Sequence, residues 1–382
     1  MTKIEWTKRP GTIGVAWNPL RVRNLETGGI GHFCEKVSAG CKNCYAETFQ
    51  KRFQNPIRYA AQDADQVEVF LDEKTLLEPL KWKKPRTIFV CSQTDIFLRH
   101  YSDEMICKVF AVMALCPFDT LIVLTKRPER AKVFLQSEQM QEQIGQMMRE
   151  IDPGATCYQC PDLDGIWPLR NVWLGTSVED QATANERIPV LLDTPAAVRF
   201  ISAEPLLGPI DVSRWLSVAW QCSGCRGYFS GGWQRTCPDC GKTNYWSGSH
   251  KFNGRKRPKN PICPPQSGQG LDWVIVGGES GNKGRPMHPD WARSLRDQCK
   301  AADVPFFFKQ WGAWFATYDR DHDDPDWRKI PKIKGNHQRF VNIKGGHGFH
   351  GDRVVFMEKS SKKKTGRLLD GVEHNAWPGD AA

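Results

Sequence analysis

Seven short apolar runs recur along the chain, and each ends in polar residues or glycine. Continuous apolar runs of this length are typical of β-strands that are buried on both faces, as in parallel sheets. The predicted strands lie at residues 13–19, 87–95, 120–127, 172–180, 198–205, 273–280 and 304–312.

Helix-like segments lie between several of these strands, at residues 102–116, 179–194 and 288–302. Ser102, followed by acidic residues, is a predicted helix start, and Pro289 or Asp290 is another. Because strands and helices alternate, the pattern predicts an α/β fold, a complete or partial (β/α) barrel of the TIM type. The active site of such a barrel lies at the carboxyl ends of its strands.

Two insertions interrupt the alternation, a small one at residues 145–168 and a larger one at 216–270. Residues 1–215 are then expected to form the first part of the barrel, and residues 271–315 its last strands. Residues 316–382 make a C-terminal extension whose fold the pattern does not predict.

The amino-acid composition and the net charge indicate which class of protein the chain belongs to. Of 382 residues, 40% are hydrophobic and 25% charged, which is typical of a soluble globular protein. No apolar run reaches the roughly 18 residues of a membrane span, and no secretory signal is recognisable, so we expect a cytoplasmic protein without a membrane partner. The net charge of +10 suits a nucleic acid, although a Lys-rich tract such as residues 360–367 is usually only solvated surface.

Fourteen cysteines in a cytoplasmic chain favour metal sites over disulfides. Within the larger insertion, two CxxC pairs separated by 11 residues predict a zinc ribbon, with iron as the alternative metal. The four ligands are Cys222, Cys225, Cys237 and Cys240. A basic, Pro-rich linker follows them.

A further CxxC pair, Cys157 and Cys160, has no recognisable partners. Half of a second zinc site, ligands of an auxiliary cluster and a redox pair all remain open for it.

A second constellation holds Cys34, Cys41 and Cys44 in one short loop, with the spacing C-x6-C-x2-C. Three thiolates on a [4Fe–4S] cluster leave one iron open for a small molecule. The spacing alone equally allows a zinc site completed by His32, or a four-thiolate site that recruits Cys91.

The position of this loop, after the first predicted strand of a barrel, resembles that of the cysteine loop in radical S-adenosylmethionine enzymes. Blocks reading VSAGCKNCYAE, LTKRPER, VWLGTSVEDQ, FISAEPLLGPI, WVIVGGESG and PFFFKQWG, in this order, are similar to a phage- and prophage-associated family of three-Cys-motif proteins of unknown function. Some members resemble the spore photoproduct lyase branch in the cysteine loop. The resemblance implies a [4Fe–4S] cluster that binds S-adenosyl-L-methionine and generates a 5′-deoxyadenosyl radical.

Polar residues at neighbouring strand ends are candidates for holding the amine and ribose of that cofactor. A carboxylate suits both groups, because charge-assisted hydrogen bonds are strong. The cofactor candidates are Asp95, Ser177, Glu179 and Glu204. The alternative is that some of these residues cap the following helix, as Asp180 does in our prediction.

Cations beside an aromatic ring would suit a phosphate-bearing substrate, such as a nucleotide or nucleic acid. The substrate candidates are Lys126, Arg127, Glu279, Lys309, Gln310 and Trp311. Ion pairs between these cations and Glu204 or Glu279 are the structural alternative.

The sequence therefore predicts a radical S-adenosylmethionine-type enzyme that modifies or repairs a nucleotide or nucleic acid and receives its electron from a donor protein. One alternative is a zinc-dependent nucleic-acid-binding protein without catalysis. Another is an iron–sulfur protein that serves a partner protein encoded nearby.

Overall fold

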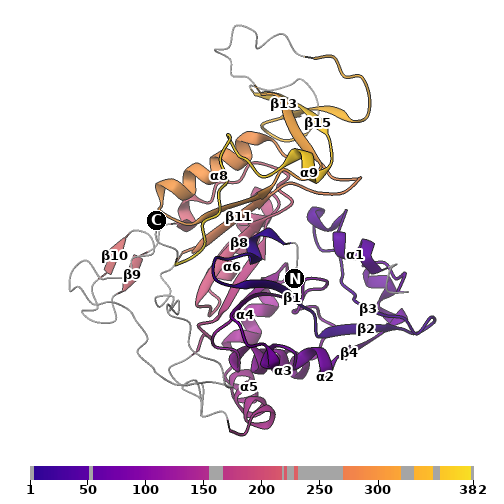
Figure 1. The fold of residues 1–382 in the computed structure, drawn as a ribbon, viewed down its shortest axis with the longest axis vertical. Helices are drawn as coiled ribbons and strands as arrows, with labels where there is room; N and C mark the ends of the chain where they lie inside the picture. Colours follow the sequence, from indigo (N-terminus) through magenta and orange to yellow (C-terminus); the bar gives the residue numbers. More distant parts are fainter. Residues whose placement is uncertain are drawn as a thin grey trace.

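The structure is a computed structural model that describes residues 4–50, 55–154, 167–216, 219–221, 228–230, 270–319, 331–346 and 353–379. Its centre is one sheet of seven parallel strands, in the order β1-β5-β6-β7-β8-β11-β12 (Figure 1). The strands are β1 (Ile13–Trp17), β5 (Arg86–Val90), β6 (Thr120–Thr125), β7 (Val172–Ser177), β8 (Val198–Ala203), β11 (Trp273–Gly277) and β12 (Phe306–Gln310). All seven predicted strands are therefore present.

The strand order follows the order along the chain, so each new strand adds to the same edge of the sheet. This winding curls the sheet into a half-barrel, and no pairing joins β1 to β12 within the described residues. Because the strands are parallel, their carboxyl ends all lie at one edge of the half-barrel.

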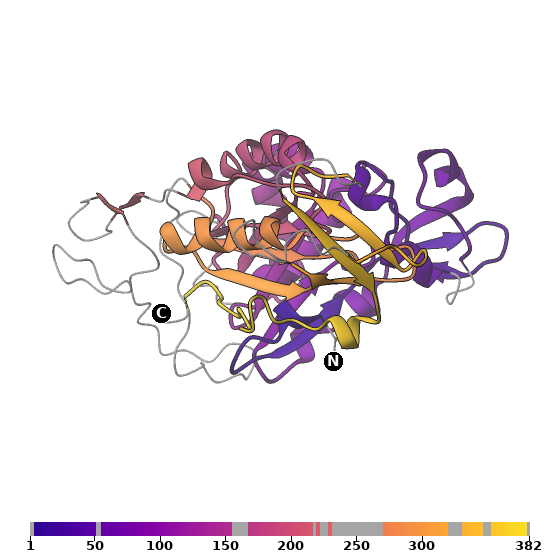
Figure 2. The ribbon, with the colours of Figure 1, turned by 90° about the horizontal axis from the view of Figure 1, so that it is seen from above.

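Helices cover the outer face of the sheet (Figure 2). They are α3 (Asp103–Ala114), α4 (Pro128–Gln136), α5 (Glu138–Ile151), α6 (Gln181–Leu192) and α8 (Pro289–Ala301). Ser102 caps α3 as predicted, since its hydroxyl accepts a hydrogen bond from the Met105 N–H at 3.2 Å. Pro289 is the first residue of α8, and His288 is its cap.

Aromatic side chains fill the inner face of the half-barrel, where Phe89, Trp173, Phe200, Trp273 and Phe307 form one cluster. The two ends of the chain complete this cluster. The short helix η1 (Glu5–Thr7) lies against β1, β5 and β12 and brings the ring of Trp6 to 4.6 Å from that of Phe89. From the other end of the chain, the ring of Trp377 packs edge-on against that of Phe307, with the centroids 5.0 Å apart. The open side of the half-barrel is thus closed by packing.

Two antiparallel sheets flank the half-barrel. The first, β3-β2-β4, was not predicted, and it places a hairpin between β1 and the cysteine loop. The second, β13-β15-β14, gives the C-terminal extension a defined fold. Their strands are β2 (Leu20–Asn24), β3 (Ile30–Gly31), β4 (Val67–Leu71), β13 (Trp314–Tyr318), β14 (Gln338–Asn342) and β15 (Val354–Lys359).

The remaining elements are short. They are η2 (Ala39–Cys41), α1 (Tyr45–Gln50), η4 (Ala61–Gln66), α2 (Glu73–Leu76), η5 (Pro79–Lys81), α7 (Ser213–Leu216), β9 (Ala219–Gln221), β10 (Tyr228–Ser230) and α9 (Lys362–Thr365). Helix α5 extends into the predicted insertion at 145–168, and Cys157 and Cys160 lie outside the described residues. So do the four cysteines of the predicted zinc ribbon, although the antiparallel pair β9–β10 brackets the first two in sequence. Across the described part of the chain, no helix has the length and apolar character needed to cross a membrane.

Candidate metal and cofactor site

Three thiols share one cavity at the carboxyl edge of the half-barrel. Cys34 follows β3, Cys41 ends η2, and Cys44 directly precedes α1. All three are half-buried free thiols that line a cavity of about 500 Å³, and residues at the ends of β5, β6, β7, β8, β11 and β12 line it too. A volume of this size is within the range of small-molecule sites, roughly 300–1,000 Å³.

Burial favours the neutral form of Cys34 and Cys44. Burial raises the pKa of Cys34 to about 12, although Nη1 of Arg127 lies 3.9 Å from its sulfur. Burial also raises the pKa of Cys44. Loading with metal must therefore release protons, because only the thiolate is a metal ligand.

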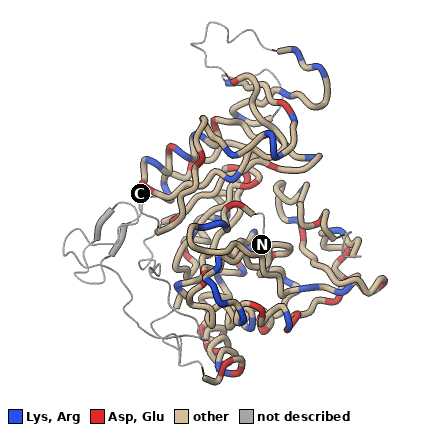
Figure 3. Tube along the Cα trace, in the orientation of Figure 1, with Lys and Arg blue, Asp and Glu red and all other residues tan. Residues whose placement is uncertain are grey.

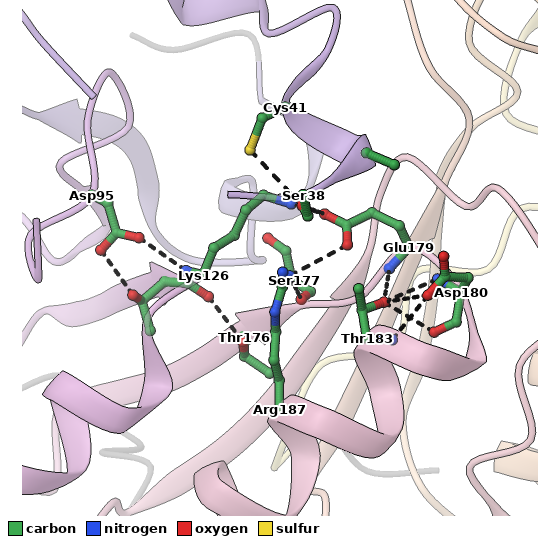
Figure 4. Close-up of polar contacts among 12 residues, drawn as sticks. Ser38, Cys41, Asp95, Lys126, Thr176, Ser177, Glu179, Asp180, Thr183 and Arg187 are labelled. Carbon is green, nitrogen blue, oxygen red and sulfur yellow. Dashed lines mark hydrogen bonds and ion pairs between the residues drawn. The ribbon is translucent and has the colours of Figure 1, made fainter. Parts of the chain in front are cut away.

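Glu179 anchors the cysteine loop to the end of β7 (Figure 4). Its fully buried carboxylate accepts a hydrogen bond from the Ser38 hydroxyl at 2.8 Å and one from Arg187 Nη1 at 3.3 Å, and it pairs with Lys126. The backbone of the loop comes so close that a Cβ at Gly40 would lie 2.3 Å from Glu179 Oε1. Only glycine fits there without a shift.

Glu279 provides a second anchor, beyond the end of β11. Arg285 binds its carboxylate through Nε at 2.8 Å and Nη2 at 2.7 Å, and Nη2 also donates to the carbonyl of Ala39 in the loop. Nδ2 of Asn43 donates to the same carboxylate at 3.0 Å. Burial opposes ionisation of Glu279, but the hydrogen bonds from Arg285 and Asn43 lower its pKa below the usual value.

Asp95 organises the end of β5. Its carboxylate accepts hydrogen bonds from the Thr125 hydroxyl at 2.8 Å, the Lys126 N–H at 2.9 Å and Arg127 Nη1 at 3.0 Å. Arg127 then reaches the loop, where Nη2 donates to the carbonyl of Glu35 at 3.0 Å. Asp95 therefore positions the cation that lies beside Cys34.

The wall that faces the loop is polar. Lys309 Nζ lies 2.8 and 2.7 Å from the two carboxylate oxygens of Glu204, and Gln310 Nε2 lies 3.2 Å from one of them. These ion pairs match the structural alternative, but they still leave both Lys309 and Glu204 on the cavity surface.

Most predicted site residues are brought together. Besides the three cysteines, the cavity is lined by Asp95, Ser177, Glu204, Lys126, Arg127, Glu279, Lys309 and Gln310. Glu179 and Trp311 do not line it. Trp311 packs against Phe308 in the core, and its indole N–H donates to the carbonyl of Leu368 at 2.8 Å, so its ring is not presented for stacking on a substrate.

His32 and Cys91, the two residues that could complete a zinc site with the three cysteines, lie in different places. Cys91 lines the cavity, whereas buried His32 does not, and Nδ1 of His32 lies 3.0 Å from the carbonyl of Leu20. Burial lowers the pKa of His32 to about 4.

Within the described residues, no group of three metal-ligating side chains is arranged to hold a single metal ion. In a [4Fe–4S] cluster each thiolate binds a different iron, so the ligands lie farther apart than around a single ion. Three thiols around one cavity fit such a cluster.

The residues that hold the loop were largely missed from the sequence. Tyr45 and Tyr59 donate to the carbonyls of Ser92 and Gln93, at 2.6 and 2.8 Å, and Ser38 acts through Glu179. These contacts join residues 34 to 141 positions apart, so no local spacing reports them. The one local signal was Tyr45 itself, an aromatic residue directly after the third cysteine.

A family model described as "Protein of unknown function (DUF5131)" matches residues 1–378. No curated protein and no solved structure matches the chain.

Proposed function

The chain belongs to the family described as "Protein of unknown function (DUF5131)", and we propose that it is a radical S-adenosylmethionine-type iron–sulfur enzyme. One observation carries this proposal: three thiols from a single loop line a cavity at the carboxyl edge of parallel strands. The proposal includes a partial TIM-type barrel, with a zinc ribbon inserted at 216–270.

Cys34, Cys41 and Cys44 would hold a [4Fe–4S] cluster. With S-adenosylmethionine bound, such a cluster would supply one electron for reductive cleavage of the sulfonium C–S bond, which would give methionine and a 5′-deoxyadenosyl radical. Arg127, beside Cys34, offsets the negative charge that three thiolates bring into a half-buried site.

Ser177 and Glu204 are the side chains best placed to bind the cofactor's amine and ribose, since both line the cavity and Glu204 retains 19% exposure. Glu179, at 0% exposure, acts instead as a positioning residue for the loop. Asp95 lines the cavity, but its oxygens are already occupied by the end of β6, so it too positions rather than binds.

The substrate in this proposal is a nucleotide or nucleic acid. The chain's net charge of +10 favours a polyanion, and Lys126, Arg127 and Lys309 bring cations to the cavity. A cytoplasmic location and an electron-donor protein complete the proposal.

The test is to purify the protein anaerobically, count iron, sulfide and zinc, and record low-temperature EPR spectra before and after adding S-adenosylmethionine. We expect about four irons per chain, a reducible cluster signal that shifts with the cofactor, and 5′-deoxyadenosine after reduction. Zinc alone, with no iron even after reconstitution, would overturn the proposal and favour a nucleic-acid-binding protein without catalysis.

A further inference from the structure

Two described segments of the C-terminal extension are strongly basic. Residues 331–346 and 353–379 hold ten Lys and Arg but only three Asp and Glu, a net charge of +7, whereas residues 316–382 as a whole hold 13 Lys and Arg and ten Asp and Glu, a net charge of +3. Figure 3 shows these basic positions recurring along the segment that forms β14, β15 and α9. Such a concentration of charge in one region creates a local field for a polyanion.

The three acidic residues within these two described segments, Glu358, Asp370 and Glu373, all have partners. Asp370 pairs with Arg293 and Arg296 of α8, and Glu358 accepts a hydrogen bond from Gln338 at 2.7 Å. Lys363 and Lys364 of α9 are exposed, and neither forms an ion pair with any residue that the structure describes. Among the described residues, no carboxylate neutralises their charges.

Helix α9 lies at the cavity. Lys362 lines the cavity and pairs with Glu5 at 2.9 Å, and the Thr365 hydroxyl fixes the end of the helix by donating to the carbonyl of Gly312 at 2.9 Å. The Lys-rich tract at 360–367, which the sequence alone leaves as ordinary solvated surface, thus stands beside the proposed site.

The same basic surface continues to the cysteine loop. Lys359 Nζ donates to the carbonyl of Asn282, and the carbonyl of Lys283 accepts a hydrogen bond from Asn43 at 2.9 Å. These contacts place Lys283 between β15 and the loop, next to exposed Lys42. Neither Lys42 nor Lys283 makes an ion pair within the described ranges.

We infer that these lysines form a docking track for the sugar–phosphate backbone of a nucleic acid, an inference that rests on the proposed function. The track is defined as Lys42, Lys283, Lys359, Lys363 and Lys364. Lysines that contact phosphates position a strand without reading its sequence. Because the track borders the cavity, it would hold the strand while one nucleotide reaches the thiol loop.

The test measures binding of labelled 20-nucleotide single-stranded DNA and RNA by fluorescence anisotropy, between about 50 and 300 mM salt. The variant K363E/K364E is compared with K81E/K83E, a matched reversal of two exposed lysines that precede β5 at the opposite end of the sheet. We expect K363E/K364E to weaken binding at least about 10-fold and to reduce the slope of log K against log salt by about 1.4, since each phosphate contact on a single strand contributes about 0.7. The control should bind like the wild type, and circular dichroism spectra of both variants should match the wild type.

Equal losses in both double variants would overturn the track, because they would report only non-specific charge. So would unchanged binding in K363E/K364E, or binding to phosphatidylserine vesicles without binding to either oligonucleotide. Measuring the wild type before and after iron reconstitution separates the two proposals. If the protein takes up no iron but still binds oligonucleotides through the track, the docking track is supported and the proposed enzymatic function is overturned. If the protein assembles a cluster but binds no oligonucleotide, the proposed enzymatic function is supported and the docking track is overturned.

Discussion

Buried carboxylates occur at both ends of the parallel strands, but they have different neighbours. At the amino ends, Asp119 accepts the N–H of Arg86 at 2.8 Å, and Asp272 accepts the N–H of Arg199 at 2.7 Å. Both carboxylates bond to the backbone of an adjoining strand. At the carboxyl ends, by contrast, Glu179 and Glu279 bind cationic side chains and the loop that carries the thiols.

The pKa values of Asp272 and Glu279 reflect these different neighbours. Burial raises the pKa of Asp272 to about 7, because the Arg199 N–H and guanidinium only partly compensate for lost hydration. Glu279 is buried as well, yet its hydrogen bonds from Arg285 and Asn43 lower its pKa. A buried carboxylate is therefore not in itself a sign of function. The combination of a paired carboxylate, a tethered loop and a cavity is what marks the site.

The largest effect is expected from the thiols themselves. The variant C34A/C41A/C44A should lose iron and lower the yield of 5′-deoxyadenosine by more than about 100-fold, beyond the loss typical of residues that only support a metal site. Iron per chain and product yield are the measurements. The control is Cys299→Ala, which removes a fully buried thiol of α8 and should retain iron. Full iron content in the triple variant would show that the loop is not the cluster site.

Glu179→Gln tests the anchoring at the carboxyl end. It leaves buried Arg187 and partly buried Lys126 without their counter-charge, so we expect the free energy of unfolding to fall by about 3 kcal/mol. Iron affinity should fall by roughly 10- to 100-fold, because the glutamine amide has one acceptor oxygen in place of two and can no longer accept from both Ser38 and Arg187. Denaturant titration and iron retention during dialysis are the measurements. The matched change Glu186→Gln, at an exposed position of α6, should stay within about 0.5 kcal/mol, and equal effects of the two would contradict the anchoring role.

Asp272→Asn tests the amino end through pH. The folded-state pKa of about 7 lies above the usual aspartate pKa of 3.8, so between about pH 4 and pH 7 the folded protein binds a proton that the unfolded chain has released. In that window, Asp272 makes stability fall as pH rises, with a limiting slope of about 1.4 kcal/mol per pH unit, and its contribution is constant above it. The asparagine variant should remove this slope and leave iron content unchanged. Urea unfolding at pH 5, 6, 7 and 8 measures the difference, and a difference that does not vary with pH would refute the assignment.

The sequence predicted the half-barrel well because its strands are continuous apolar runs, and burial on both faces leaves a strong pattern. It did not predict β2, β3 and β4, which are short and partly exposed, or the sheet formed by β13, β14 and β15. The cysteine loop follows the first strand in sequence as expected, but the sequence did not predict the hairpin of β2 and β3 that lies between them.

The candidate residues were found where strand ends are polar, since parallel strands bring those ends to one edge. What the sequence could not reveal is which carboxylate faces the cavity and which one anchors the loop. Glu179 and Glu204 occupy similar positions after their strands, yet only Glu204 lines the cavity. That distinction depends on Ser38 and Arg187, whose contacts with Glu179 exist only in the folded chain.

Arg285→Lys should have the smallest effect, because it keeps the charge at Glu279 but removes the two-point geometry. A lysine cannot bind both carboxylate oxygens and the carbonyl of Ala39 at once, so we expect a loss of about 1 kcal/mol in the free energy of unfolding. Asn43 still bonds to Glu279, so the loop should stay in place but release iron a few-fold faster to a chelator. Arg23→Lys, at an exposed pair on β2, is the control and should match the wild type in both measurements. If Arg285→Lys also matches the wild type in chelator kinetics, the Glu279 anchor does not restrain the thiols, and the loop depends on its other contacts, among them those of Glu179, Arg127 and Tyr45.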